Sequence, residues 1–247
     1  MSKNLQKRFW EIDFLRGVAI VMMIVFHIVF DMTFFGVRDF AVNKIYWRIF
    51  ARSTATVFLL LVGLSLTLSY SRFLKIKKTN PKFKKYLKRG AVVLGCGLLI
   101  TFFTRLVIGD AYVEFGILHL IGISIIFAFP FLKYKYLNLI LGIFIILAGL
   151  VLKNYAFNFD WLFWLGFIPN NLYTVDYFPL LPWFGIVLVG IFLGNTLYPS
   201  YKSIITLPDY SKKPLFRFFS FLGKNSLLIY LVHQPVIILS LFILGFA

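Results

Sequence analysis

Cysteine and negative charge are both scarce in this sequence of 247 residues. Cys96 is its one cysteine, which excludes an intramolecular disulfide and a cysteine-based metal site. Asp and Glu together number 9 against 26 Lys and Arg, so the formal net charge is +17. Such a charge can mark a nucleic-acid-binding protein, but here the lysines lie in short segments between long apolar runs. We therefore interpret them as topology signals and expect no nucleic acid as a partner.

Several signatures of soluble enzymes are also missing. The sequence has no glycine-rich phosphate loop, no complete nucleophile elbow and no paired-carboxylate glycosidase pattern. Each of the three histidines stands in a different apolar run, so no two form a close pair of metal ligands, and we expect no metal. The first apolar run is not followed by a small-residue cleavage site, and we expect it to be retained.

Apolar residues, in contrast, are abundant. Hydrophobic side chains make up 60% of the sequence, a share that indicates a polytopic helical membrane protein. We predict an all-α bundle of about seven transmembrane helices, formed by 1–247 as a single integral membrane domain in the plasma membrane. The predicted spans are approximately 13–35, 52–72, 89–108, 116–132, 137–152, 180–198 and 225–246.

The distribution of basic residues predicts the orientation of these spans. With the N-terminus in the cytoplasm, 19 of the 26 Lys and Arg residues fall on the inner side, and nine of them lie between Arg72 and Arg89. That basic run is interpreted as a loop facing solvent or lipid headgroups. The segment 153–179 then lies outside, either as an interfacial lid or as a plain aromatic belt. We predict a cytoplasmic N-terminus and an outer C-terminus.

The first apolar run carries four ionisable side chains on one face. At about 100° per residue, Asp13, Arg16, His27 and Asp31 fall within an arc of roughly 60°. An Arg or Asp facing lipid at depth costs several kcal/mol, so this arc should face the bundle interior or a wet cavity. Asp31 lies one turn beyond His27 and can accept a ring N–H from it. We therefore predict His27 as a catalytic base and Asp31 as the residue that orients it.

Further polar residues stand near the ends of the other apolar runs. In the last run, Ser226, Tyr230 and His233 are spaced i, i+4 and i+7, which places them on one helical face. We predict that acceptor binding, or stabilisation of a developing oxyanion, draws on a set of nine: Arg52, Arg105, His119, Asp176, Trp183, Asn225, Ser226, Tyr230 and His233.

Four stretches together resemble a known family. They are "EIDFLRGVAIVMMIVFHIVFDMTFFG", "EFGILHLIGIS", "FPLLPWFGIVLVGIFLG" and "LGKNSLLIYLVHQPV". In this order they are similar to the heparan-alpha-glucosaminide N-acetyltransferase catalytic-domain family, specifically its small prokaryotic branch, within the transmembrane acyltransferase superfamily. In related sugar O-acetylases the first helix carries Arg, ten residues and then His, a spacing that Arg16 and His27 match.

The resemblance implies transfer of an acyl group, usually acetyl, from cytosolic acyl-CoA to an acceptor at the other membrane face. Acetyl-CoA is then the donor, with Arg16 and Asp13 near its phosphates and the thioester reaching towards His27. His27 either deprotonates an attacking amine or hydroxyl or first takes the acyl group itself. A sugar of the cell envelope is the expected acceptor, and a homodimer is one option for assembly.

Two other functions fit the residues. Intramembrane Asp, Arg and His also mark ion pathways, so a small-molecule or proton-coupled transporter is the leading alternative. A non-catalytic scaffold, in which the polar face locks helices together, is the third. No inverted repeat is visible in the sequence, which favours the enzyme over the transporter.

Overall fold

The computed structural model describes residues 8–246, which divide into two compact units. Among the described residues, the terminal unit combines 8–58 with 207–246, and the central unit is Leu59–Thr206. Helix α2 (Ile45–Lys77) contributes residues to both.

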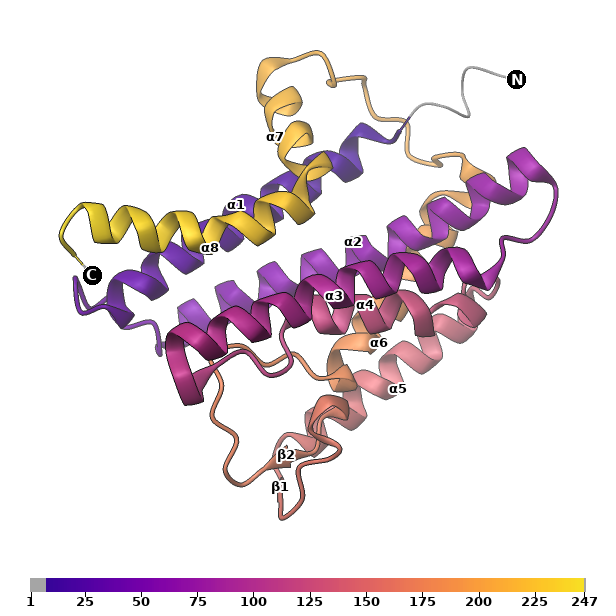
Figure 1. Ribbon diagram of the computed structural model, residues 1–247. Coiled ribbons are helices and arrows are strands. Elements are labelled where there is room, and N and C mark those ends of the chain that lie inside the picture. The colour runs from indigo at the N-terminus through magenta and orange to yellow at the C-terminus, as the bar shows by residue number, and fades with distance from the viewer. Residues whose placement is uncertain (1–7, 247) are drawn as a thin grey trace. The chain divides into compact units, whose positions relative to one another are not determined.

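The terminal unit is built around α1 (Trp10–Phe34). Helix α8 (Ser226–Ile243) runs beside α1 in the same direction, and the short α7 (Pro214–Lys224) crosses α1 near its start (Figure 1). Glycines permit this crossing, because a Cβ on Gly17 would lie 1.9 Å from the backbone oxygen of Phe219. Rings of α1 and α7 then pack together, with Phe14 and Phe216 centroids 4.9 Å apart. The two backbones are thus in direct contact.

The central unit packs the rest of α2 with α3 (Phe83–Ile108), α4 (Ile117–Phe127), α5 (Tyr136–Leu152) and α6 (Leu180–Leu197). Helices α5 and α6 run antiparallel and touch at Gly149, where an added Cβ would lie 2.5 Å from the backbone nitrogen of Pro182. Helices α2 and α6 meet through a buried hydroxyl, because Thr67 donates to the carbonyl of Ile191 at 3.3 Å. Small residues therefore set the close helix spacing, as is typical of membrane bundles.

Short elements connect these helices. The segment between α5 and α6 contains β1 (Ala156–Phe157) and β2 (Ile168–Pro169), which pair in parallel (Figure 1). The 3₁₀ turns are η2 (Gly109–Ala111), η3 (Phe129–Phe131), η4 (Phe163–Leu165) and η5 (Pro199–Tyr201).

Five helices among residues 8–246 are long and apolar enough to cross a membrane. Their outer surfaces are apolar too, since large side chains of α3 such as Leu98, Phe102 and Leu106 are exposed. A water-soluble protein seldom exposes an apolar surface of this kind, whereas lipid solvates it. The prediction of an all-α polytopic bundle is therefore confirmed, and the chain is an integral membrane protein. The five are Trp10–Phe34, Ile45–Lys77, Phe83–Ala111, Leu180–Leu197 and Ser226–Ile243.

The other two predicted spans, 116–132 and 137–152, form shorter apolar helices. Helix α4 ends at Phe127, and Pro130 follows within the turn η3, because proline cannot supply the next helical N–H. Helix α7 lies between the predicted spans 180–198 and 225–246, where no helix is predicted, because its basic residues Arg217 and Lys224 interrupt the apolar run. It is an amphipathic helix whose protein-facing side holds Ser220 and Gly223.

Candidate functional site

Two histidines meet where α1 and α8 lie side by side. The ring centroids of His27 on α1 and His233 on α8 are 4.8 Å apart, with an interplanar angle of 63°. Nδ1 of His27 and Nε2 of His233 are both buried and have no hydrogen-bond partner among residues 8–246. Each of these two contacting rings therefore has one nitrogen that is free to exchange a proton with a ligand.

The hydrogen bond of His233 assigns its tautomer. Its Nδ1 lies 2.6 Å from the backbone oxygen of Tyr230, and because a carbonyl can only accept, Nδ1 carries the proton. Nε2 then presents a lone pair, which makes it the basic nitrogen of this ring. Tyr230 thus contributes its backbone to the site, while its ring packs against His233 with centroids 5.3 Å apart.

Asp31 has a different partner from the one expected. The side-chain amide of Gln234 donates to both carboxylate oxygens of Asp31 at 2.9 Å, whereas no hydrogen bond joins Asp31 to His27. Gln234 belongs to the facing helix α8, so the carboxylate of Asp31 joins α8 to α1 and does not hydrogen-bond its neighbour on α1. Gln234 is not among the predicted residues, although a glutamine directly after His233 in an apolar run is a usable signal.

The start of α1 holds the other charged pair. Arg16 donates to the carboxylate of buried Asp13 at 3.2 Å, and its second contact is the backbone oxygen of Gly223 at 3.4 Å. The close crossing of α7 brings that carbonyl within reach. Asp13 and Arg16 therefore form an ion pair anchored to the end of α7, at the opposite end of α1 from the two histidines.

His119 lies in the central unit and has both ring nitrogens occupied. Its Nδ1 accepts from the backbone N–H of Gly116 at 3.2 Å, so Nε2 carries the proton and faces Thr101 Oγ1 at 3.3 Å. The Thr101 hydroxyl in turn donates to the carbonyl of Val113 at 2.7 Å. This network ties the start of α4 to α3. His119 is thus engaged in holding the central unit together.

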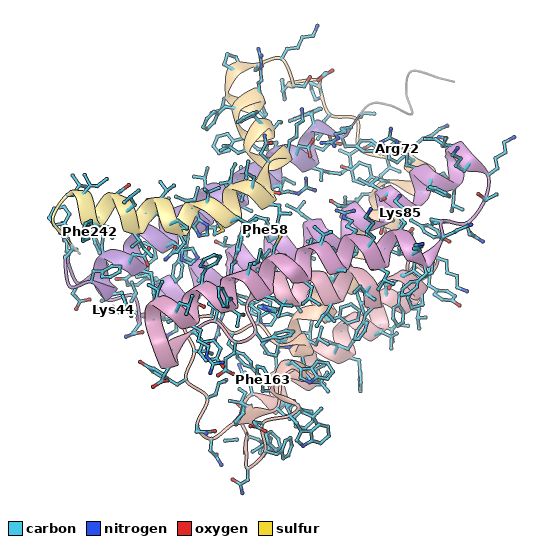
Figure 2. All side chains as sticks on the ribbon, viewed as in Figure 1. Lys44, Phe58, Arg72, Lys85, Phe163 and Phe242 are labelled. Carbon is cyan, nitrogen blue, oxygen red and sulfur yellow. The ribbon has the colours of Figure 1, made fainter. Side chains whose placement is uncertain are left out.

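Asp176 is a half-buried carboxylate at the start of α4. Its Oδ2 accepts from the backbone N–H of Ile117 at 3.4 Å, at the positive end of that helix. Burial nevertheless dominates and raises the pKa of Asp176 to about 7. In the same connecting segments, burial and then the charge of Asp160 raise the pKa of Glu114. The hydroxyl of Tyr177 donates to the carbonyl of Phe163, labelled in Figure 2, at 2.7 Å.

The raised pKa of Asp176 predicts that stability falls as pH rises. A folded-state pKa of about 7 against a usual value of 3.8 means that the folded chain binds more protons than the unfolded chain between these pH values. Each pKa unit corresponds to about 1.4 kcal/mol, which sets an upper limit of about 4 kcal/mol. Asp176→Asn should therefore melt near the unchanged protein at pH 4 and several degrees above it at pH 8, in purified protein followed by tryptophan fluorescence.

The matched control is Asp110→Asn, which changes the same charge on an exposed side chain in η2. This control should follow the pH dependence of the unchanged protein. Equal melting temperatures of Asp176→Asn and Asp110→Asn across pH 4–8 would contradict the raised pKa of Asp176.

The remaining predicted residues are spread over both units. Arg52 on α2 is exposed, and exposed Arg105 near the end of α3 lies over the ring of Tyr112, 5.3 Å from its centroid. Trp183 packs on Phe178 with centroids 4.9 Å apart. Asn225 separates α7 from α8, donates to the backbone oxygen of Phe221 at 2.9 Å, and precedes Ser226, the first residue of α8. Of the predicted set, the structure brings together His27, Asp31, Tyr230 and His233.

Among residues 8–246, no group of three or more His, Cys, Asp and Glu side chains is arranged to hold a metal ion. A family model described as "Heparan-alpha-glucosaminide N-acetyltransferase, catalytic" matches residues 8–235. No curated protein and no solved structure matches the chain. The matched range includes both paired histidines and most of both units.

Proposed function

Because the chain belongs to the heparan-alpha-glucosaminide N-acetyltransferase catalytic family, we propose that it is a membrane acetyltransferase that uses acetyl-CoA. The proposed acceptor is an amine or hydroxyl of a cell-envelope sugar at the outer face of the plasma membrane. The observation that carries the proposal is the contact between His27 and His233, each with an unpartnered buried nitrogen.

In the proposed reaction the acceptor amine or hydroxyl attacks the thioester carbonyl of acetyl-CoA. His27 takes the proton that the acceptor loses, so that the new acetyl–nitrogen or acetyl–oxygen bond forms as the acetyl–sulfur bond breaks. The departing thiolate recovers that proton and leaves as CoA. A variant of the same chemistry passes the acetyl group through His27 first.

His233 supports this role for His27. Its Nε2 carries no proton, so a neutral imidazole lies 4.8 Å from His27, centroid to centroid, and adds no positive charge that would oppose the imidazolium formed when His27 takes a proton. Asp31 adds a negative charge one turn away from His27, which favours the same imidazolium. Gln234 holds that carboxylate in place from α8, directly beside His233. Asp31 and Gln234 are thus positioning residues.

Replacement of Gln234 by leucine should lower kcat by about 10–100-fold with little change in KM for acetyl-CoA. The variant leaves the carboxylate of Asp31 without its donor and loosens the register between α1 and α8, and a displacement of about 1 Å can cost 10²-fold in rate. Initial rates at several acetyl-CoA concentrations separate the two constants. Ser240→Ala, which alters an exposed hydroxyl on the same helix, should keep both constants unchanged.

The proposed function is tested with purified protein in lipid nanodiscs and radiolabelled acetyl-CoA, with and without envelope glycans. Label on the glycan supports direct transfer, and label on the protein supports the route through an acyl histidine. Absence of label from both, together with solute flux in proteoliposomes that needs no acyl-CoA, would overturn the enzyme in favour of a transporter.

A further inference from the structure

Three basic side chains gather where α2 ends and α3 begins. This basic cluster consists of Arg72 on α2 with Lys85 and Arg89 on α3, the last two being one helical turn apart. Figure 2 shows Arg72 and Lys85 at the same end of the central unit. Lys85 is close enough to both arginines to be repelled by their charges. Like charges at this spacing are unfavourable unless an anion lies between them.

The central unit supplies no such anion. All nine carboxylates of the sequence lie among the described residues, and the four in this unit are Asp110, Glu114, Asp160 and Asp176. Each of the four follows the C-terminal end of α3 or of α5. At about 1.5 Å per residue, the end of α3 is roughly 28 Å from Arg89 along the helix axis. The counter-charge of the basic cluster must therefore come from outside this unit.

The cluster also contains an unsatisfied donor and a fixed lysine. Nε of Arg72 is buried and has no acceptor among residues 8–246. The ammonium of Lys85 donates to Ser69 Oγ at 3.2 Å and lies over two rings, 5.3 Å from the centroid of Phe73 and 5.7 Å from that of Tyr86. A buried N–H without an acceptor is unfavourable, and an acceptor oxygen from a ligand would relieve it. The site is thus shaped for an oxyanion.

We propose that the basic cluster binds the phosphate group of a phosphate ester. A guanidinium presents its N–H donors in a planar fork that matches phosphate oxygens, and the cluster offers two. Helices α2 and α3 are both long and apolar enough to cross a membrane, and the basic cluster lies where one ends and the other begins, at the level expected for lipid headgroups. This position favours an anionic lipid headgroup as the source, with a soluble phosphate ester as the other. A lipid headgroup at this site is independent of the proposed acetyltransferase activity, whereas CoA at this site rests on it.

The test measures binding to the full-length protein in nanodiscs by native mass spectrometry. One arm compares phosphatidylglycerol with phosphatidylcholine, and the other titrates CoA into phosphatidylcholine nanodiscs. The cluster variant is Arg72→Gln with Arg89→Gln. The matched control, Lys84→Gln with Lys88→Gln, removes the same charge from exposed positions on the same helix.

The cluster variant should bind about 100-fold more weakly in at least one arm, since it loses two guanidinium groups that hydrogen-bond the phosphate, each worth about 1.5 kcal/mol. The control should lose at most about threefold. Loss in the lipid arm identifies a headgroup site, and loss in the CoA arm identifies a soluble phosphate ester. Equal losses in the two double variants, or binding unchanged in both arms, would overturn the proposal whatever the transfer assay shows.

Discussion

Alanine in place of His27 is expected to reduce acetyl transfer by about 10²–10⁴-fold, the usual contribution of a general acid–base group. The reason is local: among the described residues, the buried Nδ1 of His27 has no partner, and its ring lies 4.8 Å from that of His233. Without the His27 imidazole, the basic nitrogen left in this contact is Nε2 of His233 on α8, which does not occupy the position of the proposed base. The measurement is the initial rate of label transfer from acetyl-CoA at saturating donor.

Two further variants separate chemistry from folding. His27→Gln keeps a polar side chain of similar size and should be as inactive as His27→Ala, because an amide cannot act as a base at neutral pH. Both proteins should insert and elute from size-exclusion chromatography like the unchanged chain. Turnover by His27→Gln within threefold of the unchanged enzyme would show that His27 merely joins helices, and the proposed mechanism would fail.

Alanine in place of Gly223 is expected to destabilise the terminal unit by about 3 kcal/mol or more, at the upper end of overpacking penalties. Its Cβ would lie 1.8 Å from the backbone oxygen of Asp13 and 2.9 Å from the backbone nitrogen of Gly17. Neither backbone atom can move unless α1 and α7 separate. Trp10 reports on this contact, because its ring packs on Phe216 at 5.4 Å. A fall of about 10 °C in the fluorescence melting temperature is expected.

Gly95→Ala is the matched control for that substitution. A Cβ on Gly95, in the middle of α3, would meet nothing within 4 Å. Alanine should therefore be neutral or stabilise the helix by up to about 1 kcal/mol. If Gly223→Ala had the same melting temperature as Gly95→Ala, the close approach of the α1 and α7 backbones at Gly223 would be contradicted.

The long helices were predictable because their apolar runs are longer than the apolar stretches found in loops. All seven predicted stretches became helices, with bounds within a few residues for α6 and α8 and a longer α2 than expected. The predicted helices were wrong in the end of α4 and in the omission of α7. Helix α4 stops before Pro130, and the aromatic and basic residues of α7 alternate too closely to resemble a membrane span.

The candidate site was partly predictable for a similar reason. A charged or imidazole side chain in an apolar run is expensive unless it has a partner, so His27, Asp31 and His233 stood out from the sequence. Their pairing was not predictable, because it depends on the register between α1 and α8. In the observed register, Gln234 hydrogen-bonds Asp31 and the ring of His27 contacts that of His233. Periodicity within one helix cannot supply this information.

The separation of charge in the central unit has an electrical consequence. Nine basic residues between Arg72 and Arg89 stand at one end of α3, and the carboxylates of this unit follow the helix ends at the other. If the basic end faces the cytoplasm, as the distribution of Lys and Arg predicts, a membrane potential that is negative inside favours this placement of both groups of charges. Each unit charge moved against 100 mV costs about 2.3 kcal/mol. In that orientation the membrane potential opposes inversion of this part of the bundle.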